Sequence, residues 1–200
     1  MNKLTISIGN NKIGNTLNFS VTPHLTCSDN CEFKVKGCYA KRICAFRKNV
    51  ATCYENNYIN TLKSDFVNKF KVTMDCLTSG VKYEFFRWHV AGDVYSQDYL
   101  NKIYSICKKY KGIKFFLPTA SWDEGLDFKG KPSNLVIKNS FGSNIHAEQL
   151  NNFKSSYVLK KDDKLLHEKK FMKGKFICLN DCNKCRQCWN EKLDIIFIKH

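Results

Sequence analysis

Two dense groups of cysteines constrain the fold of this chain more than any other feature. The N-terminal set is Cys27, Cys31, Cys38 and Cys44. More than a hundred residues later, the C-terminal set packs four cysteines into eleven residues, at Cys178, Cys182, Cys185 and Cys188. Thiols two or three residues apart let one loop wrap around a single metal centre, as in iron–sulfur clusters and structural zinc sites. We therefore expect a metal-cluster protein.

The rest of the composition favours this interpretation over a disulfide scaffold. The chain has 200 residues and an odd total of eleven cysteines, and its first residues lack the apolar segment of a signal peptide. No apolar run approaches the roughly 18–20 residues of a membrane span. We expect a cytosolic protein that does not enter membranes and whose thiols stay reduced and free to bind metal. The remaining cysteines, Cys53, Cys76 and Cys107, fall on predicted helices and are expected to be core thiols.

The spacing within the C-terminal set indicates which metal it prefers. Its gaps of three, two and two residues are those of a bacterial ferredoxin run read backwards, which favours an iron–sulfur cluster. With Cys188 as fourth ligand, such a cluster would be closed and either auxiliary or structural. A four-cysteine zinc site is the alternative.

The charge balance points to a polyanionic partner. The formal net charge is +15, which favours nucleic acid or a nucleotide as partner. The abundance of Lys, Asn, Ile, Phe and Tyr is also what an AT-rich coding sequence produces, and no arginine-rich tract is present. The charge alone therefore gives only a first hypothesis for the substrate.

The apolar pattern predicts strands that alternate with helices. Strands are predicted at residues 4–8, 17–21, 83–90, 113–117, 135–137, 156–159 and 194–198. Helices are predicted over 40–78 and 97–110, the second capped by Ser96. This succession is typical of βαβ units and a parallel sheet.

These elements predict one α/β domain over residues 1–200. An eight-unit barrel takes about 250 residues, so we expect a partial barrel or an open, mostly parallel sheet. The N-terminal strands lie in 1–22, a cysteine loop in 23–45, and the C-terminal cysteine-rich segment with the final strand in 174–200.

Three polar segments follow predicted strands directly. The cysteine loop follows the strand ending near Val21, Gly92 and Asp93 follow the next central strand, and Thr119 to Ser121 follow the third. Ligands of parallel α/β folds bind at the carboxyl ends of the strands, so these segments are expected to meet at one rim. Arg87 and His89 alternate on their strand, so both are expected to face the site, although a strand histidine is also typical of a buried, hydrogen-bonded core residue.

Several of these segments carry a resemblance to known proteins. They are Asn18–Pro23 leading to Cys27, Cys38–Ala40, Arg87–Asp93, Phe115–Thr119 and Cys182–Trp189. On them the chain resembles the radical S-adenosylmethionine (SAM) enzymes and, within that neighbourhood, the phage family known as gene product 88. The resemblance covers most of the chain and implies a radical-SAM-like partial barrel, encoded by a phage or prophage.

The resemblance implies a [4Fe-4S] cluster held by Cys27, Cys31 and Cys38, with one iron open to SAM. Electron transfer into the sulfonium would release a deoxyadenosyl radical that abstracts hydrogen from a nucleic acid or nucleotide. Asp93 would bind the SAM amino group, Gly92 would let the backbone approach closely, and Tyr39 would lie against the adenine. Thr119 is a further candidate for cofactor binding. Arg87, His89 and Asp93 are the candidate catalytic residues.

The chain also departs from the radical SAM pattern. Its N-terminal set has gaps of three and six residues instead of three and two, and Gly37 replaces the usual aromatic residue before the third cysteine. Cys44 is available as a fourth thiolate that would close the site and exclude SAM. The three-then-two spacing occurs instead at Cys178, Cys182 and Cys185. The alternative function is a non-catalytic, basic iron–sulfur or zinc module that binds nucleic acid or a host protein.

Overall fold

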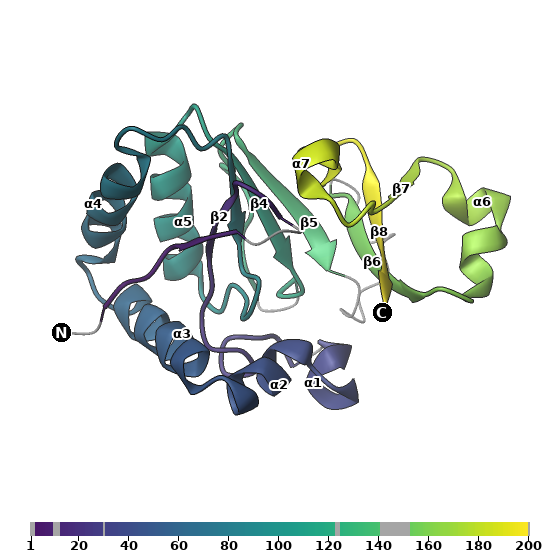
Figure 1. Cartoon of the computed structure of the whole chain (residues 1–200), viewed down its shortest axis with the longest axis horizontal. Helices are drawn as coiled ribbons and strands as arrows, with labels where there is room; N and C mark the ends of the chain where they lie inside the picture. The colour runs from purple at the N-terminus through teal and green to yellow at the C-terminus, as the bar shows by residue number, and fades with distance from the viewer. Residues whose placement is uncertain (1–2, 10–12, 30, 123–124, 141–152, 200) are drawn as a thin grey trace.

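The computed structural model describes residues 3–9, 13–29, 31–122, 125–140 and 153–199. Its centre is one eight-stranded sheet (Figure 1). The strands are β1 (Ser7–Ile8), β2 (Leu17–Phe19), β3 (Phe85–Trp88), β4 (Lys114–Thr119), β5 (Leu135–Ser140), β6 (Ser155–Lys160), β7 (Lys175–Ile177) and β8 (Asp194–Lys199). Each predicted strand is present, and β7 is an addition that the sequence pattern did not indicate.

The sheet is open and mostly parallel, as predicted. Its strand order is β1-β2-β3-β4-β5-β6-β8-β7. Only the β1–β2 pair is antiparallel among the strand pairs of the described residues. From β2 to β6 the strands follow one another in chain order, so their carboxyl ends all lie along the same edge.

The helices lie in two groups along the sheet. They are α1 (Glu32–Lys36), α2 (Tyr39–Phe46), α3 (Lys48–Thr61), α4 (Phe66–Thr78), α5 (Gln97–Lys109), α6 (Lys169–Met172) and α7 (Cys182–Cys185), with short 3₁₀ turns η2 (Lys164–His167) and η3 (Gln187–Trp189). The helices α1 to α5 lie at one end and on one face of the sheet, whereas the short α6 and α7 lie near β7 and β8 at the other end (Figure 1). Figure 1 shows α4 and α5 side by side against the central strands, while α1 and α2 lie beyond the end of β2. The helix predicted over 40–78 is therefore three helices. The predicted cap of α5 is confirmed, because the Ser96 hydroxyl accepts a hydrogen bond from the Tyr99 amide at 3.2 Å.

The period-2 alternation of the strands sorts their side chains between two faces. Phe86 and Trp88 of β3 are fully buried on the face that α4 covers, where Phe70 lies 5.2 Å from the Trp88 ring. Arg87, between them in sequence, points to the opposite face. Because most of the apolar core packs beneath α4 and α5, the opposite face is left to hold a site.

Candidate functional site

A cavity of about 600 Å³ lies against this opposite face of the sheet. Its floor comes from alternate residues of five strands: Arg87 of β3, Phe116 and Pro118 of β4, Ser140 of β5, Ser156 and Val158 of β6, and Phe197 of β8. The strand register confirms that these residues form one band, since Arg87 pairs with Phe116 and Val158 pairs with Phe197. The volume lies in the range of small-molecule sites.

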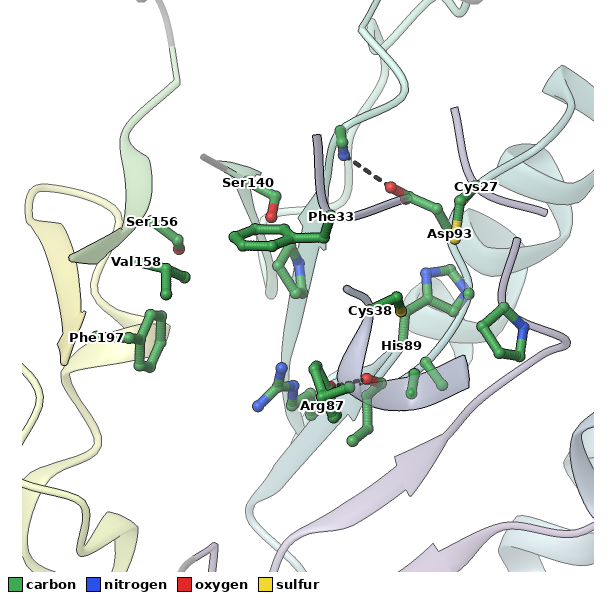
Figure 2. Close-up of a pocket in the computed structure, with 18 of the residues that line it drawn as sticks. Cys27, Phe33, Cys38, Arg87, His89, Asp93, Ser140, Ser156, Val158 and Phe197 are labelled. Atoms are coloured by element: carbon green, nitrogen blue, oxygen red, sulfur yellow. Dashed lines mark hydrogen bonds between the residues drawn. The ribbon is translucent and has the colours of Figure 1, made fainter. Parts of the chain in front are cut away.

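Both cysteine sets line this one cavity. Three thiols come from the N-terminal set (Cys27, Cys31, Cys38) and three from the C-terminal set (Cys178, Cys182, Cys188). Cys44 and Cys185 are not among the lining residues. The expected meeting of the cysteine loop with Gly92 and Asp93 is confirmed, because both segments line the cavity (Figure 2). Of the segment after β4, Ala120 lines it as well. The thiol spacing gave no sign that the C-terminal set faces the same space.

The N-terminal thiols are presented by loop and helix ends. Cys31 and Cys38 are the residues immediately before α1 and α2, both with extended backbone, and Cys27 lies in the turn after β2. Burial raises the pKa of Cys27 to about 12, with the Asp93 carboxylate and the neighbouring thiols adding to the rise. Burial likewise raises the pKa of Cys31. Without metal, Cys27 and Cys31 therefore stay protonated, and metal binding would release protons.

The donor chemistry of both sets fits a thiolate-bound metal centre, but the sites are not preassembled. Within the described ranges, no three His, Cys, Asp or Glu side chains are grouped closely enough to hold one metal ion. The N-terminal thiols nonetheless influence one another electrostatically, as do the four of the C-terminal set. The thiols of each set would have to move closer together on binding metal.

Asp93 is held rigidly at the edge of the cavity. Its Oδ1 accepts a hydrogen bond from the Val94 amide and its Oδ2 one from the Ala120 amide, both at 2.7 Å. The Thr119 and Ser121 hydroxyls also interact with the carboxylate, yet burial prevails and raises the pKa of Asp93 to about 6. A carboxylate has about four lone-pair sites, and these two amides and two hydroxyls account for them, so a ligand donor would have to share or replace one of these partners.

Gly92 is required by its backbone and by its neighbours. Its φ of +79° lies in the left-handed region, and an added Cβ would stand 2.5 Å from Val21 Cγ2 and 2.7 Å from Thr26 Oγ1. The Thr26 hydroxyl in turn accepts a hydrogen bond from the Asp93 amide at 3.2 Å. The close approach that glycine permits here is thus to the start of the cysteine loop, one residue before Cys27.

Arg87 and His89 both line the cavity, but only Arg87 is placed there by strand alternation. β3 ends at Trp88, and His89 follows it with a left-handed φ of 55°. The Nε of Arg87 is buried without a hydrogen-bond partner among the described residues, and its guanidinium lies 5.9 Å from the centre of the Phe116 ring. His89 is buried, with Nε2 2.9 Å from the Tyr99 hydroxyl. Burial, aided by the positive charge of Arg87, lowers the pKa of His89 to about 3, so His89 is a neutral hydrogen-bonding group at neutral pH.

Tyr39 and Thr119 occupy different positions relative to the cavity. Tyr39 lines it, with its ring half exposed and its hydroxyl donating a hydrogen bond to the Val90 carbonyl. Thr119 is fully buried and does not line the cavity. Its hydroxyl accepts a hydrogen bond from the Ser121 amide at 3.1 Å and interacts with Asp93, so Thr119 acts through the position of Asp93.

The C-terminal set is fastened by two residues that sequence reasoning did not single out as anchors. The Trp189 indole donates a hydrogen bond to the Phe86 carbonyl at 3.1 Å, and the ring packs on Phe85 and Phe116. The guanidinium of Arg186 lies 4.4 Å from the centre of the Phe85 ring and donates a hydrogen bond to the Thr16 hydroxyl at 2.6 Å. The sequence signal that could have indicated this anchoring is the presence of an arginine within the cysteine run and a tryptophan directly after it.

The other cysteines do not share one environment. Cys107 is buried, which confirms a core thiol, and Cys53 is half-buried. Cys76 is exposed on α4, so its assignment to the core was wrong: the helix covers the sheet with its opposite side, which carries Phe66, Phe70 and Met74.

The family of the chain follows from comparison with known families. The family model described as gene product 88 matches residues 2–191. The chain belongs to the gene product 88 family. Comparison with curated proteins and with solved structures finds no match. No helix in the described part of this gene product 88 protein has the length and apolar character needed to cross a membrane.

Proposed function

We propose that this gene product 88 protein is a phage-encoded, cytosolic iron–sulfur protein of radical-SAM-like architecture. In this proposal Cys27, Cys31 and Cys38 hold a [4Fe-4S] cluster, and the adjoining cavity takes SAM and a substrate. The observation that carries the proposal is that these three thiols line the same cavity as Gly92 and Asp93, whereas Cys44 does not. Three ligands facing a cavity leave a fourth coordination position for a small molecule.

The strand order supports the proposed architecture. The strands from β2 to β6 are parallel neighbours in chain order, and the sheet then ends with β8 followed by β7, where the order reverses. A doubly wound sheet reverses its order at an internal switch point, so the consecutive run from β2 to β6 supports the proposal of a barrel segment. The cavity lies on the face opposite α4 and α5, which in such a segment is the inner face.

Several side chains have positions suited to the proposed ligands. When bound, the cluster would supply the electron that cleaves SAM to a deoxyadenosyl radical. Asp93 would accept hydrogen bonds from the SAM amino group, because the Val94 and Ala120 amides already fix its orientation. Tyr39 would contact the adenine. The unpartnered Nε of Arg87 offers a buried donor, and a buried donor without a partner favours a polar ligand group nearby.

The C-terminal set is proposed to hold a second, auxiliary metal centre. The Cys188 thiol interacts electrostatically with each of the other three thiols of this set, which suits a closed four-cysteine site. An iron–sulfur cluster is the first choice from the spacing, and zinc is the alternative. Iron, acid-labile sulfide and zinc contents of the purified protein distinguish the two.

The test is to purify the full chain without oxygen, reconstitute it with iron and sulfide, and add SAM with a reductant. We expect brown protein and release of deoxyadenosine. The triple variant C27A/C31A/C38A should lose the release of deoxyadenosine but keep the metal of the C-terminal set. The variant C53A/C76A, which removes two thiols outside both sets, is the matched control. Protein that binds iron and sulfide but neither binds nor cleaves SAM would exclude the enzyme.

A further inference from the structure

The rim of the cavity carries a basic and aromatic surface on α2. Tyr39, Arg42, Ile43 and Phe46 occupy positions i, i+3, i+4 and i+7 and therefore share one face of this helix. Tyr39 and Arg42 line the cavity, and farther along the helix the Phe46 side chain is 81% exposed. This face runs from the cavity outward to the surface. In Figure 1 α2 lies beyond the end of β2, away from α4 and α5.

The surrounding charge is of one sign. Residues 33–54 contain six lysines and arginines and no aspartate or glutamate. Four of the six, Lys41, Arg42, Arg47 and Lys48, are exposed on or beside α2. None of these four forms an ion pair with a carboxylate of the described residues. Elsewhere several lysines do pair, for example Lys69 with Asp65 on α4 at 2.9 Å.

We infer that this face of α2 docks single-stranded nucleic acid and leads a nucleotide toward the cavity. Unpaired cations supply contacts to phosphates, and exposed aromatic rings supply stacking surfaces for unpaired bases. Duplex bases are already stacked on one another, so the exposed Phe46 ring favours a single strand. This inference rests on the proposed function, because it identifies single-stranded nucleic acid as the substrate that the cavity acts on. Binding itself needs neither SAM nor the cluster.

An anionic membrane is the competing occupant of such a surface. An interfacial helix presents a broad apolar face with the cations on the opposite side. On α2 a guanidinium lies within the aromatic face, because Arg42 is placed between Tyr39 and Phe46. The helix is also only eight residues long. Both features favour the nucleic acid.

The test measures binding of fluorescein-labelled 20-nucleotide single strands, DNA and RNA of one sequence, by anisotropy without SAM. The full chain, purified without oxygen, is titrated between 50 and 200 mM KCl. R42Q/R47Q should weaken binding about tenfold and make the plot of log affinity against log salt shallower by about 1.4, since each contact to a single strand contributes about 0.7. K108Q/K109Q removes the same charge from exposed positions on α5 and should change affinity less than twofold.

The contribution of stacking is tested at constant charge. F46A should weaken binding roughly fivefold or more with the salt dependence unchanged. V72A, which truncates an apolar side chain 70% exposed on α4, is the matched control and should have no effect. Circular dichroism melts check that all four variants fold, which is expected since every substituted side chain lies at the surface.

Specific results would overturn the inference. It fails if K108Q/K109Q weakens binding as much as R42Q/R47Q, or if F46A leaves the affinity for both strands unchanged. It also fails if the protein binds vesicles containing phosphatidylserine, and F46A abolishes this vesicle binding but leaves nucleic-acid binding unchanged. If the variants change binding as expected but the protein does not cleave SAM, the inference is supported and the proposed function is contradicted. If the protein cleaves SAM but F46A leaves nucleic-acid binding unchanged, only the inference is contradicted.

Discussion

The N-terminal and C-terminal cysteine sets both give three thiols to one cavity, but different interactions hold them there. The N-terminal set spans two short helices. Its first residues are held by a buried hydrogen bond from the Asp93 amide to the Thr26 hydroxyl, which lies against Gly92. The C-terminal set spans eleven residues and is anchored by the rings and guanidinium of Trp189 and Arg186. Thiol spacing indicates a metal preference, but neighbouring residues that bind no metal decide where the thiols lie.

Removal of the aromatic anchor should have the largest effect. Trp189 is 8% exposed, so W189A should lower the free energy of unfolding by about 3–5 kcal/mol. In metal-free protein, the C-terminal thiols should then react faster with a thiol reagent, while Cys27, Cys31 and Cys38 keep their rates. Mass spectrometry of the labelled peptides reads out the two sets separately.

W122A is the matched control for that variant. Trp122 packs on Phe128 and Phe153 at ring distances of 4.5 and 4.9 Å, so its loss also removes a large aromatic side chain. It should destabilise the protein without accelerating the C-terminal thiols selectively. Equal acceleration of both sets by W189A would show that one common element, and not Trp189, holds the C-terminal set.

The polar support of the N-terminal set should be sensitive to acid. The pKa of His89 is about 3 in the folded chain against 6.5 in the unfolded one, so His89 reduces stability as the pH falls below 6.5. The pKa of Asp93 is about 6 against 3.8 unfolded, so Asp93 adds stability as the pH falls from 6 toward 4. In the wild type these two effects oppose each other.

Single substitutions should separate the two effects. Between pH 7 and 4.5, H89Q should gain stability relative to wild type and D93N should lose it, each by on the order of 2–3 kcal/mol. Urea unfolding of metal-free protein at several pH values provides the measurement. The slopes matter more than absolute stabilities, because an amide at Asp93 can no longer accept both backbone hydrogen bonds. Parallel slopes for wild type and both variants would contradict the assigned pKa shifts.

The glycine beneath the N-terminal set should give a smaller effect. In G92A the new Cβ would collide with Val21 and Thr26 in a left-handed backbone, so we expect a loss of about 1–3 kcal/mol. The faster thiols should now be those of the N-terminal set, the reverse of the W189A pattern. G112A places a Cβ where nothing lies within 4 Å, and it should leave both stability and thiol rates unchanged. A loosened C-terminal set in G92A would show that the two sets are not independently held.

The two cysteine sets also differ in how well their positions could be predicted from the sequence. The rim formed by the cysteine loop, Gly92 and Asp93 was predictable, because parallel strands in chain order bring their carboxyl ends together. The position of the C-terminal set was not, because it depends on Trp189 reaching the Phe86 carbonyl across 103 residues. Local patterns likewise predicted α5 with its Ser96 cap but missed the three-residue β7, since a strand that short has hardly any alternation to detect.

Loss of Cys44 should have the smallest effect of all, and it tests whether the two sets differ in ligand number. Cys44 lies in α2, off the cavity, and the only other thiol that raises its pKa is Cys38. Cys185 also lies off the cavity, yet its thiol contributes to the raised pKa of both Cys182 and Cys188. C44A should therefore keep its reconstituted iron and its deoxyadenosine release, whereas C185A should lose metal from the C-terminal set. Metal content per chain and the visible absorption of both variants give the measurement. If C44A instead loses its cluster, the N-terminal set is a closed four-thiolate site, SAM has no coordination position there, and the basic non-catalytic module becomes the better account.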